Sequence, residues 1–145
     1  MGAAPSAESL SSLALIALAR NDLEQARAAL CESLTAAWKY GPRWLVAVGL
    51  EGFSWLAVGE SRAERSVELL AVATALRTSI GAPLPPLRQG FFERWHHKTQ
   101  ALLGTELWHH CWQSGTTMPL ENAVKFALEL HPESSSITVP VRKIS

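Results

Sequence analysis

The chain lacks the residue patterns that usually identify catalytic or metal centres. Its two cysteines, Cys31 and Cys111, are too few for a disulfide framework, and they form no Cys-x-x-Cys pair. The nine glycines are scattered and form no phosphate-binding loop. The 13 basic and 13 acidic side chains cancel, and no basic run is present. This balance argues against nucleic-acid binding by this segment.

Long apolar runs and secretion signals are also missing. The apolar run from Leu13 to Ala19 is shorter than a membrane span, and no positively charged region precedes it. We therefore predict a cytoplasmic protein with neither a signal peptide nor a membrane anchor. In the cytoplasm two reduced cysteines buried in helices are expected, and a disulfide between them is the alternative.

What the sequence does contain is helical periodicity along almost its whole length. At 145 residues, of which 48% are hydrophobic and 18% charged, the chain can bury one core. Apolar residues recur with the 3.6-residue period of amphipathic helices, and no strand pattern precedes the last residues. The sequence predicts an all-α fold of about seven helices with short loops. The segment from Trp44 to Val58, whose only charge is Glu51, should form the central helix.

Glycine, proline and capping residues indicate where the helices end. Asn21-Asp22 and Gly41-Pro42 are typical of turns between helices. The stretch Gly81-Ala82-Pro83-Leu84-Pro85-Pro86 cannot lie inside a helix. A helix is predicted to restart near Leu87 and to run to Leu103. Its inward face is predicted to hold Phe91, Trp95 and Leu102.

An internal repeat with an offset of 40 residues predicts the architecture. The helix Leu10–Ala17 has the same pattern of large and small residues as Leu50–Ala57, and Ala26 aligns with Ser66. Small residues let paired helices approach closely, as in tetratricopeptide repeats, whose usual period is 34 residues. The sequence therefore predicts antiparallel helix–turn–helix repeats in a right-handed, tetratricopeptide-like superhelix.

The repeat and the proline stretch together predict the organisation of the chain. We expect a single helical domain over residues 1–131, with two repeat units in 6–80 and a Pro-rich joint at 81–86. Because two units are too few to bury a continuous core, residues 87–131 should form capping helices. Their tryptophans, Trp95, Trp108 and Trp112, provide a large area for closing the stack. Residues 132–145 are predicted to form a flexible tail.

Six segments of the chain resemble motifs of one group of bacterial proteins. They are Asn21–Arg27, Leu50–Ala57, Leu69–Arg77, Gly81–Pro86, Leu107–Gly115 and Leu120–Val124. In this order they resemble the C-terminal tetratricopeptide-like region of large LuxR-type transcription regulators and related ATPases, which include maltose-activator-like proteins. The chain departs from the pattern at Ala71, where glycine is usual, and residues 132–145 do not resemble the DNA-binding helix–turn–helix that often follows.

This resemblance implies a non-catalytic interaction module of a bacterial signalling or transcription regulator. The module would bind a protein partner, another domain of the parent chain or a second copy, with no cofactor and no membrane. In maltose-activator-like regulators the repeat arm binds the inducer, so the alternative is a small-molecule sensing lobe. That alternative predicts a pocket near Trp44, Glu51 and Trp55.

Two groups of side chains leave more than one interpretation open. His96-His97, His109-His110 and Cys111 could ligate a metal, or His97, His110 and Cys111 could converge as a Cys–His catalytic centre. Adjacent helical residues point about 100° apart, so neither site is expected. The second group consists of four aromatic residues, Trp38, Trp44, Phe53 and Trp55. These side chains either pack in the core, as helical spacing favours, or line a groove.

Overall fold

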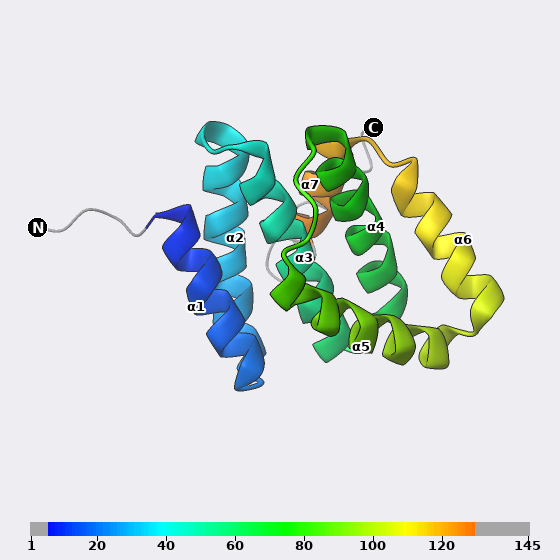
Figure 1. Ribbon diagram of the computed structural model, residues 1–145. Coiled ribbons are helices and arrows are strands. Elements are labelled where there is room, and N and C mark those ends of the chain that lie inside the picture. Colours follow the sequence, from blue (N-terminus) through cyan, green and yellow to red (C-terminus); the bar gives the residue numbers. More distant parts are fainter. Residues whose placement is uncertain (1–5, 130–145) are drawn as a thin grey trace, which may run out of the picture.

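The computed structural model of the protein describes residues 6–129, which form seven α-helices and no strand (Figure 1). The helices are α1 (Ala7–Ala19), α2 (Leu23–Tyr40), α3 (Arg43–Gly59), α4 (Ala63–Ile80), α5 (Pro86–Leu103), α6 (Thr105–Thr116) and α7 (Leu120–Glu129). The all-α prediction with about seven helices is confirmed. The predicted tail, residues 132–145, lies outside the described residues.

The helix ends follow from local capping chemistry. The hydroxyl of Ser6 accepts a hydrogen bond from the Ser9 amide at 3.1 Å and caps α1. Asp22 caps α2 in the same way by accepting from the Gln25 amide at 3.2 Å. Gly81 ends α4 with a φ of 68°, a left-handed conformation that glycine adopts without steric cost.

The pairs α1–α2 and α3–α4 are two copies of one helical hairpin. Asn21 and Ser61, which are 40 residues apart, both adopt a left-handed backbone, with φ of 60° and 63°. The amide that follows each of them donates to an equivalent carbonyl, from Asp22 to Ala17 at 2.8 Å and from Arg62 to Ala57 at 2.7 Å. The 40-residue helical repeat predicted from the sequence is therefore present in the backbone.

Small side chains bring the helices of each hairpin together. Ala14 and Ala26 are fully buried in the first unit, and Ser54 and Ser66 are fully buried in the second. The hydroxyls of Ser54 and Ser66 each donate to the main-chain carbonyl of the other residue at 2.8 Å. A buried hydroxyl is costly without such a partner, so this reciprocal pair makes serine acceptable where the first unit has alanine.

Helix α3 is the central helix, as its apolar sequence predicts. It contacts α1, α2, α4 and α7, and the large side chains of Leu50, Phe53 and Leu56 are buried. Burying side chains of this size stabilises the fold by roughly 1.5–3 kcal/mol each. Helix α2 packs closely on a glycine of α3, since a Cβ on Gly59 would lie 2.9 Å from the Cδ2 atom of Leu23.

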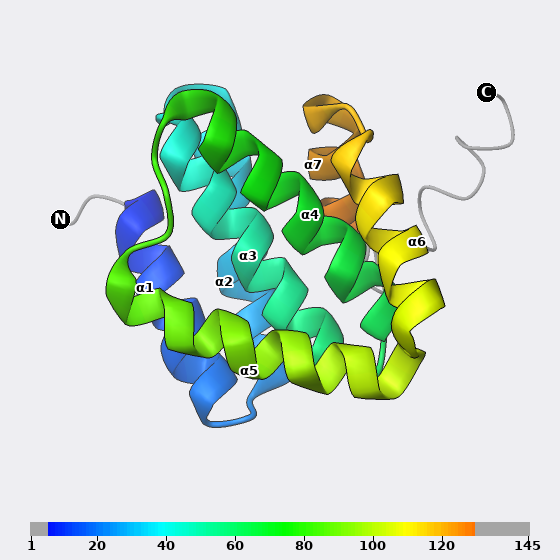
Figure 2. The same ribbon diagram turned by 45° about the vertical axis from the view of Figure 1, so that its right-hand side comes forward.

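Helix α5 does not extend the stack but crosses it obliquely (Figure 2). Only Trp95 and Thr99, one turn apart, are buried on this helix. The prediction that Phe91 and Leu102 face inward is wrong, because these side chains are 57% and 61% exposed. A helix that crosses its neighbours at an angle touches them over a short stretch, so most of its apolar face stays in solvent.

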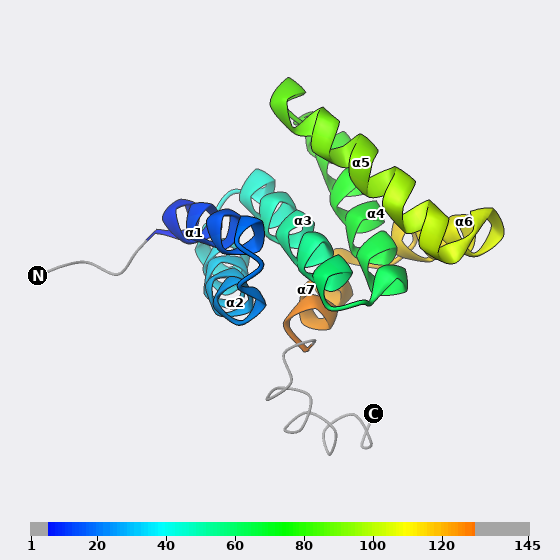
Figure 3. The same ribbon diagram turned by 90° about the horizontal axis from the view of Figure 1, so that it is seen from below.

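Helices α6 and α7 cover different sides of α4. Helix α6 packs along α4 at Gly115, where a Cβ would lie 2.7 Å from the Cβ of Ala71 and closer still to the Glu68 carbonyl oxygen. Viewed from below, α7 lies on the side of the α3–α4 pair opposite α5 (Figure 3). Residues 87–129 thus enclose α4 and leave one side of α1 uncovered.

Candidate functional site

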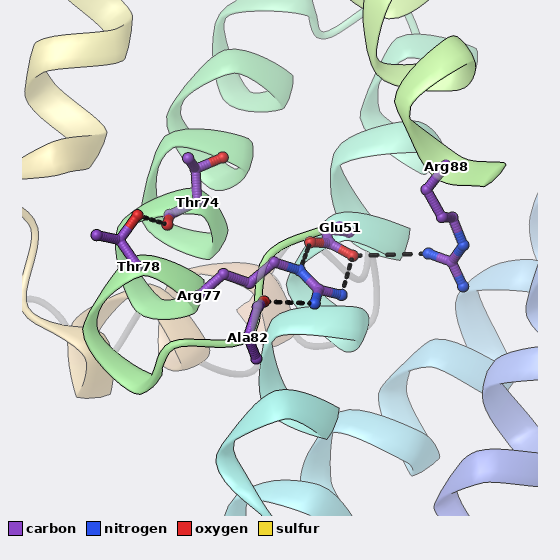
Figure 4. Close-up of polar contacts among 6 residues, drawn as sticks. All are labelled: Glu51, Thr74, Arg77, Thr78, Ala82 and Arg88. Atoms are coloured by element: carbon purple, nitrogen blue, oxygen red, sulfur yellow. Dashed lines mark hydrogen bonds and ion pairs between the residues drawn. The ribbon is translucent and has the colours of Figure 1, made fainter. Parts of the chain in front are cut away.

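A buried ion-pair cluster holds the loop that leads into α5 (Figure 4). The carboxylate of Glu51, on α3, is 2% exposed and accepts two hydrogen bonds from Arg77 on α4, at 2.5 and 3.0 Å. A third nitrogen of Arg77 donates to the Ala82 carbonyl at 3.0 Å. Arg88 of α5 places a nitrogen 3.6 Å from the same carboxylate. We call Glu51, Arg77, Ala82 and Arg88 the Glu51 cluster; it ties the Pro-rich joint to α3 and α4.

Trp95 fixes the middle of α5. Its indole nitrogen donates to the Ser66 hydroxyl at 2.7 Å, and its ring meets that of Trp55 edge-on at 6.1 Å. Thr99 donates to the Trp95 carbonyl at 2.9 Å and accepts from the indole of Trp108 at 3.0 Å. These contacts satisfy the polar atoms of two buried indoles, and they set the angle at which α5 leaves the hairpins.

An open groove of about 410 Å³ remains between α1 and α5. The two helices diverge in the view of Figure 3, and α3 lies between them. Most of the lining is apolar, and Trp55 and Trp95 contribute aromatic surface. The lining residues are Leu15, Leu18 and Ala19 of α1, Trp55 and Val58 of α3, and Arg88, Phe91, Arg94, Trp95 and Lys98 of α5.

The α5 side of the groove is positively charged. Arg88, Arg94 and Lys98 all line it, and the described lining contains no acidic residue. The guanidinium of Arg94 lies 4.8 Å from the ring centre of Phe91, so a cation–π contact holds it beside the exposed ring. Among the described residues Lys98 has no carboxylate within 4 Å. The groove thus combines an apolar floor with one cationic side.

The three residues predicted as ligand contacts lie in different environments. Trp55 lines the groove. Glu51 is buried in its ion pair with Arg77, one turn away from Trp55 on α3. Trp44 is 41% exposed near the start of α3 and does not line the groove, so it is not part of the core. These three side chains therefore do not line one common cavity.

The cationic side of the groove was not predicted from the sequence. Phe91, Arg94, Trp95 and Lys98 follow the i, i+3, i+4, i+7 spacing of one helix face. That spacing could have placed the two cations beside the aromatic residues. The prediction that Phe91 faces inward excluded this interpretation, because Arg94 and Lys98 lie on the same helix face and would then be buried as well.

Two depressions that are larger than the groove also lie on the described surface. One, of about 450 Å³, is bordered by Trp38 and Arg43 beside α4 and the loop before α7. The other, of about 790 Å³, adjoins the groove at Val58 and Lys98 and is lined by side chains of both charges, including Glu64, Arg65 and Glu68. Mixed charge gives this larger depression no electrostatic preference for one kind of ligand. The groove between α1 and α5 is the more defined site.

The histidines and cysteines do not form a cluster in the described part of the chain. No group of three His, Cys, Asp or Glu residues among residues 6–129 could hold a metal ion. His97 and His110 are exposed, whereas Cys111 is buried. Burial, together with the carboxylates of Glu68 and Glu64, raises the pKa of the Cys111 thiol. A thiol with a raised pKa is a poor nucleophile at neutral pH.

Comparisons with known proteins find no relative. No family model, curated protein or solved structure matches the sequence or the fold. No helix within residues 6–129 has the length and apolar character needed to cross a membrane. The class that the coordinates define is an all-α helical-repeat protein.

Proposed function

We propose that this protein is a non-catalytic interaction module that binds a partner protein segment in the groove between α1 and α5. The observation that carries the proposal is the combination of an apolar groove floor with an exposed Phe91 and the cations Arg94 and Lys98, which have no carboxylate within 4 Å among the described residues. Exposed aromatic and arginine side chains are enriched where proteins bind one another. A partner helix with an apolar stripe and an acidic flank complements this surface.

The test uses two synthetic 15-residue helical peptides that share one leucine stripe and differ only in their flanks, glutamate in one and lysine in the other. The glutamate peptide should bind more tightly, measured by fluorescence anisotropy, and high salt should reduce the difference. Lys98→Glu should weaken its binding by about two- to fivefold, since an exposed charge pair contributes roughly 0.2–1 kcal/mol. Lys39→Glu, on the exposed surface of α2, is the charge-matched control and should have no effect.

Two results would refute the groove as the binding site. One is equal affinity for both peptides at low salt, which would remove the electrostatic argument. The other is unchanged affinity after Phe91→Ser, since the exposed ring supplies apolar contact that serine does not replace. Phe91 is 57% exposed, so this variant should keep its fold, which circular dichroism can verify.

The second candidate, a small-molecule sensing lobe, is favoured by the volume of the groove. About 410 Å³ falls within the roughly 300–1,000 Å³ of ligand pockets. The aromatic and cationic lining would suit a small aromatic carboxylate. Titration with benzoate, followed by the intrinsic fluorescence of the protein, tests it, and an absence of saturable binding at millimolar concentration would count against it.

The wider role in a bacterial regulator is part of the same proposal and rests on the resemblance of the six sequence segments. In that role, partner binding at the groove would bias the parent protein between resting and active states in the cytoplasm. The sequence of the complete gene product tests it. An NTPase module before this segment would support the proposal, and unrelated flanking domains would refute it.

A further inference from the structure

The 40-residue repeat shows that the outer face of α1 corresponds to a face that is buried on α3. Leu13 and Ile16 are 45% and 50% exposed, whereas their equivalents Phe53 and Leu56 are at most 1% exposed. This difference arises because α3 has a helix, α2, on that side, and α1 has none among the described residues. In a stack of helical repeats, a face of this kind is covered by a helix of the neighbouring unit.

The contacts between α2 and α3 show what kind of helix such a face receives. Leu30 and Leu34 of α2 pack onto Gly52 and Gly49, and a Cβ on Gly49 would lie 3.0 Å from the Cδ1 atom of Leu34. At the end of the same interface, Arg27 of α2 forms an ion pair with Glu60. Large aliphatic side chains on one helix thus meet small residues on the other, and one charge pair closes the interface.

Helix α1 repeats the small and large positions of this surface. Ser9 and Ser12 stand where α3 has Gly49 and Gly52, and both serines are exposed. Arg20 stands where α3 has Glu60, so the charge at this position is reversed. Among the described residues Arg20 has no carboxylate within 4 Å. We call Ser9, Ser12, Leu13, Ile16 and Arg20 the outer α1 face; none of these residues lines the adjoining groove.

We propose that the outer α1 face binds a helix of a partner protein in the way that α3 binds α2. The partner helix carries large aliphatic residues at positions i, i+7 and i+11, as Leu23, Leu30 and Leu34 do on α2. At position i+4, where α2 has Arg27, the partner carries a carboxylate that pairs with Arg20. This inference follows from the continuity of the repeat and does not depend on the proposed use of the groove.

The probe is a synthetic peptide with the sequence of residues 22–41, carrying Arg27→Glu to match Arg20 and Cys31→Ala to prevent oxidation. Titrated into the isotope-labelled protein, it should shift the amide signals of the outer α1 face and leave those of α5 unchanged. A second peptide that keeps Arg27 is the matched control. It should bind about threefold more weakly or worse, since an exposed charge pair contributes up to about 1 kcal/mol.

Variants of the protein complete the test. Arg20→Glu should reverse the preference, so that the peptide that keeps Arg27 binds better than the peptide that carries Arg27→Glu. Ile16→Glu should weaken binding of both peptides at least tenfold, whereas Leu87→Glu, at an exposed apolar residue of α5, should leave binding unchanged. Arg20 is exposed, so the charge swap can be measured without loss of the fold.

Three results would overturn the proposal. The first is no shift on α1 at millimolar peptide, and the second is a charge preference that Arg20→Glu does not alter. The third is self-association of the protein alone, measured by sedimentation, that Ile16→Glu abolishes. That last result would assign the outer α1 face to a second copy of this chain instead of to a partner helix.

Discussion

Replacing Glu51 by leucine tests whether the Glu51 cluster holds α5 in place. The substitution removes a carboxylate that is 2% exposed and leaves the guanidinium of Arg77, which is itself buried, with only the Ala82 carbonyl as a partner. The second cation, Arg88, would lose the same carboxylate, and neither guanidinium would keep a carboxylate within 4 Å among the described residues. A buried charge that loses its partner keeps its desolvation cost without the compensating attraction.

The expected loss is about 3–5 kcal/mol of unfolding free energy, the cost of breaking a buried pair by removing one partner. A domain of this size has a total stability of roughly 5–15 kcal/mol, so the variant should unfold at a much lower urea concentration. The double variant Glu51→Leu/Arg77→Leu should recover part of the loss, because it removes both charges. The surface pair of Lys125 and Glu121 is the control; Lys125→Ala should cost less than about 0.5 kcal/mol.

Urea unfolding followed by far-ultraviolet circular dichroism measures these differences. The slope of the transition should stay constant among the variants, so that midpoints can be compared as stabilities. A loss below about 1 kcal/mol for Glu51→Leu would refute the reasoning, because leaving a buried arginine without its carboxylate should cost more free energy than that. A double variant that is no more stable than Glu51→Leu would refute it as well.

Two further predictions concern packing and thiol chemistry. Gly115→Ala should destabilise the protein by about 1–3 kcal/mol, because the new Cβ would meet the Glu68 carbonyl. Gly90→Ala should instead stabilise it by about 0.5–1 kcal/mol, because the nearest atom to its Cβ is 3.8 Å away. Equal effects of the two variants on urea unfolding would contradict this prediction. Burial raises the pKa of both thiols, which lowers their thiolate fraction near pH 8. A chromogenic disulfide should therefore label Cys111 more slowly in the native than in the unfolded protein, with Cys31 reacting before Cys111; native labelling of Cys111 at the unfolded rate would contradict it.

Local signals in the sequence were sufficient to predict the helices and their repeat. Gly41-Pro42, Gly81 and Pro86 end or begin helices through constraints on their own backbone, so their effect does not depend on distant residues. The 40-residue offset found in the sequence places Asn21 over Ser61, and both residues adopt the same left-handed conformation. Where the chemistry is local, the sequence and the structure agree.

The angle of α5 and the environment of Glu51 could not be predicted in the same way. Periodicity identifies the apolar face of α5 but not how much of that face a neighbour covers, and Phe91 is exposed for this reason. Glu51 is visible as the single charge of an apolar segment, yet its partner Arg77 is 26 residues away on another helix. The candidate site depends on both of these long-range features, which is why only Trp55 of the predicted contacts lines the groove.

The clustering of tryptophans around α5 gives the protein an internal optical reporter. Trp55, Trp95, Trp108 and Trp112 form a chain of ring contacts with centres 5.2–6.5 Å apart, whereas Trp38 and Trp44 have no such contact with them among the described residues. Indoles this close couple electronically and exchange excitation energy, so near-ultraviolet circular dichroism and emission should report on this cluster above all. Loosening of α5 or α6 from the hairpins can therefore be followed without any added dye, above a background from Trp38 on α2 and Trp44 on α3.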